Sequence, residues 1–276
     1  MIRMIACDLD GTLLDPEARV RPQAASHLHQ LWEQGIHIVV ATGRSWRTAL
    51  RVQQDLGIAG PILAHNGAYV FDPSKSHPDL YRHGVPASRN QEMMRWGFRH
   101  QAELRCYLGF QKPVLFTRFP EDYESWRKPE DRMISESVPI ESDPMEILLL
   151  GNHKVDQFID DFGWSGPDYE LTVFSHLGYR EVNICAPGVT KAEGLQHLAQ
   201  IYHIEASQVL AIGDGQNDIP MLQWAGVGAA VGEGLEACRQ VADYVTPAPC
   251  PDPVSAALLW AERQSLLRPF SAKQGF

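Results

Sequence analysis

Apolar residues along this chain gather in short runs that alternate with amphipathic stretches. Runs such as "IHIVVA" (36–41) and "VLAIG" (209–213) have the length of buried strands, whereas apolar positions three and four residues apart, as in 195–202, predict helices. The alternation fills residues 1–81 and resumes after residue 188. Strands that alternate with helices of this length predict an α/β fold with a doubly wound parallel sheet.

The middle of the chain breaks this alternation and predicts a separate α+β unit. One helix is expected at 88–100. Two strand pairs are expected, 103–110 with 113–119 and 170–177 with 179–185, with turns at Gln111-Lys112 and Leu177-Gly178. Paired strands with short turns are typical of antiparallel hairpins. We therefore expect three segments: a first core part at 1–81, an inserted unit at 82–188, and a second core part at 189–276.

The composition narrows the class of protein. The 276 residues are 44% hydrophobic and 21% charged, as in globular proteins with one large or two medium domains. The formal net charge of −10 disfavours nucleic acid and anionic membranes as partners. No apolar run reaches the roughly 18 residues of a membrane span, and the five cysteines include no Cys-x-x-Cys pair. We expect a reduced, cytoplasmic protein; the sequence does not indicate its oligomeric state.

Two carboxylates end the first apolar run, in "IACDLDGTLLD" (5–15). Asp8 and Asp10 lie two residues apart, and such residues on a strand point to the same face. An isolated pair is also ordinary turn chemistry, because aspartate bonds to free backbone N–H groups. Like charges held close together are costly unless a cation lies between them or one is protonated. A hard divalent ion such as Mg²⁺, which prefers oxygen ligands, would resolve this conflict.

Further polar residues follow later strands of the expected sheet. Ligands of open α/β sheets bind outside the carboxyl ends of the strands, so these residues are expected to share one crevice. Asp214 and Asp218 in "AIGDGQNDIPML" supply two more carboxylates. Thr42 ends a strand beside a helix start, where a hydroxyl suits a phosphoryl oxygen, although helix starts often carry threonine for their own sake.

Three other features allow more than one interpretation. Lys191 lies in the first turn of a helix, against the helix dipole, and is either a functional lysine or a solvated surface residue. Asn66-Gly67 by itself favours a tight hairpin turn. The segment "GVGAAVG" (226–232) has the glycines of a dinucleotide-binding loop, but its apolar part is expected to be a strand rather than the start of a helix.

Four motifs in order, "DLDGTLLD", "VVATGRS", "GVTKAEGL" and "GDGQND", resemble those of the haloacid dehalogenase superfamily of phosphohydrolases. The likeness is strongest to its Cof-type branch with a type II (subtype B) cap, and it covers nearly the whole chain. It implies a Rossmann-like core, an α+β cap formed by the insertion at 82–188, and a Mg²⁺-dependent phosphatase. The implied substrate is a small phosphorylated metabolite, such as a sugar phosphate or a similar phosphomonoester.

The resemblance also implies roles for the motif residues. Asp8 would attack phosphorus to give an aspartyl-phosphate, and Asp10 would protonate the leaving alcohol and later activate water. Thr42 would hydrogen-bond the transferring phosphoryl group, and Lys191 would neutralise it. Mg²⁺ would be held by Asp8, the main-chain carbonyl of Asp10 and Asp214, with Asp218 and Asn217 contacting its shell. The expected substrate-binding residues are Thr42, Gly43, Arg44, Asn66 and Lys191.

The chain departs from the usual pattern of the branch in three places. Ala192 stands where glycine is usual, Val231-Gly232-Glu233 replaces Met-Gly-Asn, and "PAPCPDP" (247–253) replaces an asparagine-containing segment. These changes bear on substrate contacts rather than on the reaction. The alternatives are a phosphomutase of the same fold, a non-catalytic sensor of a phosphorylated ligand, and a dinucleotide-binding oxidoreductase.

Overall fold

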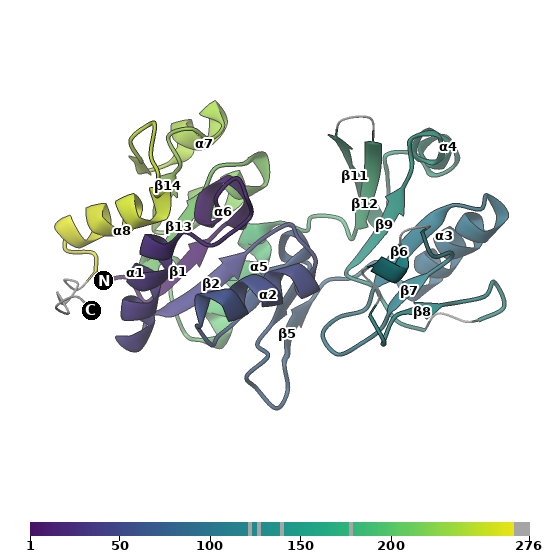
Figure 1. Cartoon of the computed structure of the whole chain (residues 1–276), viewed down its shortest axis with the longest axis horizontal. Helices are drawn as coiled ribbons and strands as arrows, with labels where there is room; N and C mark the ends of the chain where they lie inside the picture. Colours follow the sequence, from purple (N-terminus) through teal and green to yellow (C-terminus); the bar gives the residue numbers. More distant parts are fainter. Residues whose placement is uncertain (121–122, 126–127, 139–140, 177–178, 268–276) are drawn as a thin grey trace. The chain divides into compact units, whose positions relative to one another are not determined.

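The computed structural model describes residues 1–120, 123–125, 128–138, 141–176 and 179–267, and the chain divides into two compact units (Figure 1). The first unit is formed by Met1–Tyr81 together with Thr190–Phe276, and the second by Arg82–Val189. The chain therefore leaves the first unit after Tyr81 and re-enters it at Thr190. Among the described residues, no helix combines the length and apolar character needed to cross a membrane.

The first unit is built on an eight-stranded sheet in the order β15-β14-β13-β1-β2-β3-β4-β5. Its strands are β1 (Met4–Cys7), β2 (His37–Ala41), β3 (Ile62–Ala64), β4 (Tyr69–Phe71), β5 (Asp79–Arg82), β13 (Val209–Gly213), β14 (Val227–Ala230) and β15 (Tyr244–Val245). The strands from β15 to β3 pair in parallel, as the alternating pattern predicts. The strand β4 instead runs antiparallel to β3, because the chain reverses at Asn66, where φ is 55°.

Helices connect these strands and cover the sheet. They are α1 (Pro22–Glu33), α2 (Trp46–Leu56), α5 (Lys191–Ile201), α6 (Ile219–Trp224), α7 (Glu236–Val241) and α8 (Pro253–Arg263), with short turns η1 (Leu9–Leu13), η2 (His65–Gly67), η4 (Ala206–Gln208) and η5 (Gln216–Asp218). Met4 and Ala6 of β1 belong to one buried cluster with Leu195 of α5 and Met221 of α6. The intervening residues of β1 point to the opposite face of the sheet. The predicted α/β core is thus confirmed.

The second unit has its own sheet and core. Seven strands follow the order β10-β11-β12-β9-β6-β7-β8. Its elements are α3 (Ala87–Arg99), β6 (Glu103–Tyr107), β7 (Val114–Phe116), η3 (Tyr123–Ser125), β8 (Arg132–Met133), β9 (Glu146–Leu150), α4 (Asn152–Phe162), β10 (Ser165–Gly166), β11 (Tyr169–His176) and β12 (Tyr179–Cys185). Met93 of α3, Phe158 of α4 and Leu104 of β6 share one buried cluster. This unit is therefore an α+β module with a core of its own.

Both expected hairpins in this unit pair antiparallel, β6 with β7 and β11 with β12. The first hairpin is shorter than expected, because Gly109 and Gln111 both adopt positive φ angles (117° and 60°) that end the extended backbone. The expected turn at Leu177-Gly178 lies outside the described residues. Apolar periodicity therefore located these strands, whereas local backbone conformation set their ends.

Candidate active site

The first acidic residue of the site follows the strand β1 directly. The N–H of Asp8 donates to the carbonyl oxygen of Ile212 in the neighbouring strand β13 (2.9 Å). This bond fixes Asp8 at the carboxyl-terminal edge of the sheet, where the residue is only 6% exposed. The chain then turns at Gly11, which has φ 78°. A Cβ atom at Gly11 would lie 2.5 Å from Oδ2 of Asp214, so the turn needs a glycine for conformation and for space.

Lys191 is the first residue of α5 and is fully buried. Its Nζ donates to Oδ1 of Asp8 (2.5 Å) and to Oδ1 of Asp218 (2.6 Å). The helix start is fixed by Thr190, whose side-chain oxygen accepts from the N–H of Glu193 (3.1 Å). The unfavourable position of a lysine at a helix start is thus offset by two carboxylates. The alternative of a solvated surface lysine is excluded.

The first turn of α5 lies directly against the turn η2. Gly67 of η2 adopts φ 104°, and a Cβ atom there would lie 2.1 Å from the carbonyl oxygen of Thr190. Gly194 of α5 faces η2 in return, since its Cβ atom would lie 3.0 Å from the carbonyl oxygen of Gly67. Two glycines therefore let the backbone that carries Lys191 approach the backbone that carries Asn66.

The loop after β13 is organised by the side chain of Asp218. Its Oδ2 accepts from the N–H groups of Asp214 and Gly215, both at 2.9 Å. Gly213 has room for no side chain here, because a Cβ atom would lie 2.5 Å from Cγ of Asp218. The hydroxyl of Thr12 donates to Oδ1 of Asp214 (2.7 Å) and orients that carboxylate. The strand ends of β1 and β13 are thus joined by side chains as well as by the sheet.

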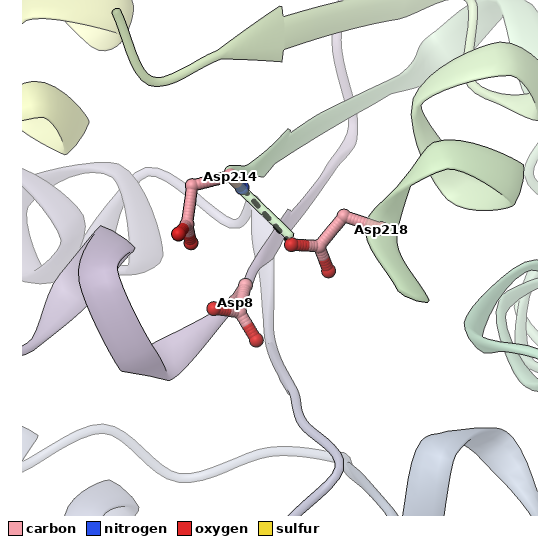
Figure 2. Close-up of side chains that lie close together, drawn as sticks. All are labelled: Asp8, Asp214 and Asp218. Carbon is pink, nitrogen blue, oxygen red and sulfur yellow. Dashed lines mark hydrogen bonds between the residues drawn. The ribbon is translucent and has the colours of Figure 1, made fainter. Parts of the chain in front are cut away.

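Three carboxylates gather at these strand ends. Oxygen atoms of Asp8, Asp214 and Asp218 all lie within 4.8 Å of one another. Figure 2 shows Asp8 on the N-terminal segment and Asp214 and Asp218 on the later segment that follows β13. Only one ammonium group, that of Lys191, bonds to the cluster within the described residues. The cluster therefore offers hard oxygen ligands and an excess of negative charge, which is the donor set that suits Mg²⁺.

The pKa shifts of Asp8, Asp214 and Lys191 reflect this excess of negative charge. Burial raises the pKa of Asp8 to about 7, with Lys191 opposing the shift and Asp218 adding to it. Burial also raises the pKa of Asp214, against the hydrogen bond from Thr12. Burial lowers the pKa of Lys191, but Asp8 and Asp218 outweigh it and the net shift is upward. The lysine therefore stays charged, whereas burial disfavours the ionised forms of Asp8 and Asp214.

The loop after β2 is linked through Asn66 to the loop after β13. Thr42 is buried, and its side-chain oxygen accepts from the N–H of Arg44 (3.0 Å). Gly43 lets Asn66 approach, since a Cβ atom at Gly43 would lie 2.9 Å from Oδ1 of Asn66. That same oxygen accepts from the amide nitrogen of Asn217 (2.8 Å). Asn66 therefore joins the loop after β2 to the loop after β13.

Asp10 is held by Arg44 rather than by the acidic cluster. The guanidinium donates from Nε to Oδ2 of Asp10 (2.8 Å) and from Nη2 to Oδ1. The side chain of Asp10 is 58% exposed. Of the predicted metal-binding residues, Asp8, Asp214 and Asp218 come together, whereas the side chains of Asp10 and Asn217 pair with Arg44 and Asn66.

The sequence patterns did not predict two residues of the site, Thr12 and His65. Thr12 is fully buried and holds Asp214; its position four residues after Asp8, in a polar turn, is the only signal for it. His65 is also fully buried, and its Nε2 accepts from the N–H of Trp46 at the start of α2 (3.1 Å). No local pattern marks His65, because its partner is 19 residues away in sequence.

Comparison with known proteins identifies the family of this chain. A family model described as haloacid dehalogenase-like hydrolase matches residues 5–258, a span that includes every residue of the site. The chain belongs to this family. The motif-based expectation of membership in the haloacid dehalogenase superfamily is therefore confirmed.

Relatives of this family align over most of the chain. The 5-amino-6-(5-phospho-D-ribitylamino)uracil phosphatase YitU of Bacillus subtilis is 25% identical over 257 residues, covering 88% of this chain and 91% of YitU. The haloacid dehalogenase superfamily phosphatase BT1666 of Bacteroides thetaiotaomicron has 25% identity and a TM-score of 0.70, with coverage of 97% and 96%. The subclass IIB sugar phosphatase BT4131 shares the fold at 18% identity and a TM-score of 0.68, with coverage of 96% and 100%. The predicted phosphatase of this superfamily is thus confirmed.

Proposed function

We propose that the protein is a Mg²⁺-dependent phosphatase that hydrolyses a small phosphorylated metabolite through an aspartyl-phosphate intermediate. The observation that carries this proposal is the buried group of Asp8, Lys191, Asp214 and Asp218. It places one carboxylate nucleophile next to a buried cation and to further hard oxygen ligands. Phosphoryl transfer depends mostly on positioning and charge neutralisation, and these residues provide both.

The substrate class rests on the relatives. YitU is named for a substrate that carries a phosphoribityl group, and BT4131 is named as a sugar phosphatase. A sugar phosphate or similar phosphomonoester is the class common to both names. The net charge of −10 agrees with a small substrate, because a long polyanion would be repelled.

Asp8 is the proposed nucleophile. Lys191 binds Oδ1 of Asp8 and fixes the plane of the carboxylate, which leaves Oδ2 to attack phosphorus. The new bond forms between Oδ2 and phosphorus while the bond from phosphorus to the alcohol oxygen breaks. The ammonium of Lys191 also balances part of the negative charge on the phosphoryl oxygens.

The metal would be held chiefly by Asp8 and Asp214, with the main-chain carbonyl of Asp10 as a third protein ligand. When bound, Mg²⁺ supplies positive charge to the phosphoryl oxygens. Asp218 already accepts from Lys191 and from two backbone N–H groups. Its role is therefore to shape the loop that presents Asp214, with Asn217 anchoring the same loop to Asn66.

Asp10 is the proposed acid and base. It would protonate the leaving alcohol and then take a proton from the water that attacks the aspartyl-phosphate. Both of its oxygens accept from Arg44 in this structure. Proton transfer therefore requires Asp10 to separate from Arg44, which frees the guanidinium for an anionic group of the substrate.

Thr42 is the proposed hydroxyl ligand of the phosphoryl group. Its oxygen accepts from the N–H of Arg44, so the hydroxyl hydrogen remains to donate to a phosphoryl oxygen. The further proposed substrate contacts are Gly43 and Arg44 on the same loop, and Asn66 of η2, whose N–H donates to the carbonyl oxygen of Thr42 (3.1 Å).

The experiment that tests the proposal is phosphate release from p-nitrophenyl phosphate, with Mg²⁺ or with EDTA. The wild type is expected to release phosphate continuously with Mg²⁺ and to stop with EDTA. Asp8→Asn keeps the size of the side chain but removes the nucleophile, and we expect a loss of about a thousandfold or more in kcat. Circular dichroism and thermal unfolding of the variant check that it remains folded.

Two outcomes would contradict the proposal. A near-wild-type rate in Asp8→Asn would exclude this carboxylate as the nucleophile. A wild type that converts a panel of sugar phosphates without steady-state release of phosphate would instead be a phosphomutase.

A further inference from the structure

Side-chain contacts within the first unit link the chain segment before the second unit to the segment after it. Tyr81 is the last residue before the chain enters the second unit, and Thr190 is the first residue after it returns. The hydroxyl of Tyr81 donates to Oε1 of Glu193, three residues beyond Thr190 (2.8 Å). The ring of Tyr81 also stacks on His197 of the same helix, with centroids 3.9 Å apart and 15° between the planes. The side chain of Tyr81, at the end of the first connection, thus contacts α5, the helix that follows the second connection.

This contact is made on the helical turn that carries Lys191. Glu193 is the third residue of α5, and its N–H donates to the N-cap residue Thr190 (3.1 Å). Its side chain accepts from Tyr81, so the first turn of α5 is held through both backbone and side chain of one residue. The other end of the same turn presents Nζ of Lys191 to Asp8.

We propose that Tyr81 is a positioning residue, whose hydroxyl holds the first turn of α5 so that Lys191 stays on the nucleophile. This deepens the proposed function and rests on it, since it assigns Lys191 a place in the reaction. Any displacement of the outgoing strand β5 is passed to α5 through the bond from Tyr81 to Glu193. Loss of that bond removes this link and leaves the ring of Tyr81 stacked on His197.

The environment of Tyr81 suits a permanent donor. Burial raises the pKa of the phenol, and the hydrogen bond to Glu193 raises it further. The hydroxyl therefore keeps its proton at neutral pH. Its ring packs against the buried cluster of the first unit, so removal of the oxygen alone leaves the packing in place.

The decisive variant is Tyr81→Phe, with Tyr202→Phe as its matched control. Tyr202 lies at the other end of α5, where its hydroxyl makes only a long bond of 3.5 Å to Asp72. We expect Tyr81→Phe to lower kcat for p-nitrophenyl phosphate by about three- to tenfold, with a smaller change in KM. Tyr202→Phe is expected to leave both constants at the wild-type values.

A second pair of variants tests the acceptor. Glu193→Ala removes it and is expected to lower kcat as Tyr81→Phe does, whereas Glu193→Gln keeps an acceptor oxygen and retains more of the activity. The double variant Tyr81→Phe/Glu193→Ala is expected to lose no more than either single variant, because both remove the same bond.

Hydrogen exchange gives a measurement that is independent of turnover. Tyr81→Phe is expected to speed amide exchange in residues 79–84 and 190–197, with no change elsewhere. Exchange and kcat that both match the wild type would overturn the proposal. Faster exchange at an unchanged kcat would also overturn it, because the bond would then be structural only. An inactive wild type would contradict the proposed Mg²⁺-dependent hydrolysis of this ester, while the exchange result would still decide whether Tyr81 holds α5.

Discussion

At the scale of single residues, the site is defined by an imbalance between three carboxylates and one buried lysine. Burial holds the pKa of Asp8 near 7, so at neutral pH this residue carries a proton in roughly half of the metal-free molecules. A carboxylate must lose its proton to bind a metal. At the proposed metal site, protons and Mg²⁺ would therefore compete for the same oxygen atoms.

This competition makes Mg²⁺ affinity depend on pH. Asp8 is mostly protonated at pH 6 and mostly ionised at pH 8, because its pKa is raised to about 7. We expect Mg²⁺ to bind about tenfold more weakly at pH 6 than at pH 8, and to release a proton as it binds at pH 6. Isothermal titration calorimetry in buffers of different ionisation enthalpy measures both quantities. Equal affinity at the two pH values would contradict the expectation, and Asp8→Asn is expected to remove the dependence.

Thr12 supports the proposed metal site through its hydrogen bond to Asp214. Its hydroxyl donates to Asp214, and the residue is fully buried. Thr12→Val keeps the shape but removes the donor, so we expect Mg²⁺ affinity to fall by about tenfold or more. Thr12→Ser keeps the donor and is expected to lose less. A Thr12→Val protein with wild-type Mg²⁺ affinity would show that Asp214 needs no such support.

At the scale of elements, the strand ends could be predicted but their contacts could not. Apolar runs located β1, β2 and β13, and the polar residues after them followed from the position of ligands in open sheets. The burial of Lys191 could not be predicted, because its partners are 183 and 27 residues away in sequence. The strand β5 has no continuous apolar run, and the sequence pattern gave no sign of it.

The fit of α5 against η2 depends on a glycine. Gly67 combines a positive φ of 104° with a position where a Cβ atom would lie 2.1 Å from a backbone oxygen. Gly57 has a positive φ of 66° but nothing within 4 Å of such an atom. We expect Gly67→Ala to lower the free energy of unfolding by about 2–4 kcal/mol, and Gly57→Ala by only about 1 kcal/mol. Urea unfolding measures both; equal losses would mean that backbone conformation, not the contact, dominates.

At the scale of the whole molecule, one domain is continuous in sequence and the other is not. The second unit has its own sheet and its own buried cluster within Arg82–Val189. The first unit needs both halves of the chain, because β1 pairs with β2 on one side and with β13 on the other.

The second unit should therefore fold without the first. We expect a fragment of residues 82–189 to unfold cooperatively on heating, because its core is complete. A fragment of residues 1–81 is the control and is expected to remain unfolded or to aggregate, since it lacks β13, β14 and β15 and leaves an edge of β1 unpaired. Circular dichroism and analytical ultracentrifugation check both fragments. A non-cooperative 82–189 fragment would show that the first unit is needed for its folding.

The split sheet also sets the order of events on the ribosome. Strands β1 to β4 emerge early, but β13, which pairs with β1, is made only after the whole second unit. At about 5–20 residues per second, the nascent chain spends several seconds with β1 as an open apolar edge. The second unit can fold during that interval, whereas Asp8 meets Asp214 and Asp218 only after the last third of the chain has begun to appear. The enzyme thus acquires its reactive centre late in its own synthesis.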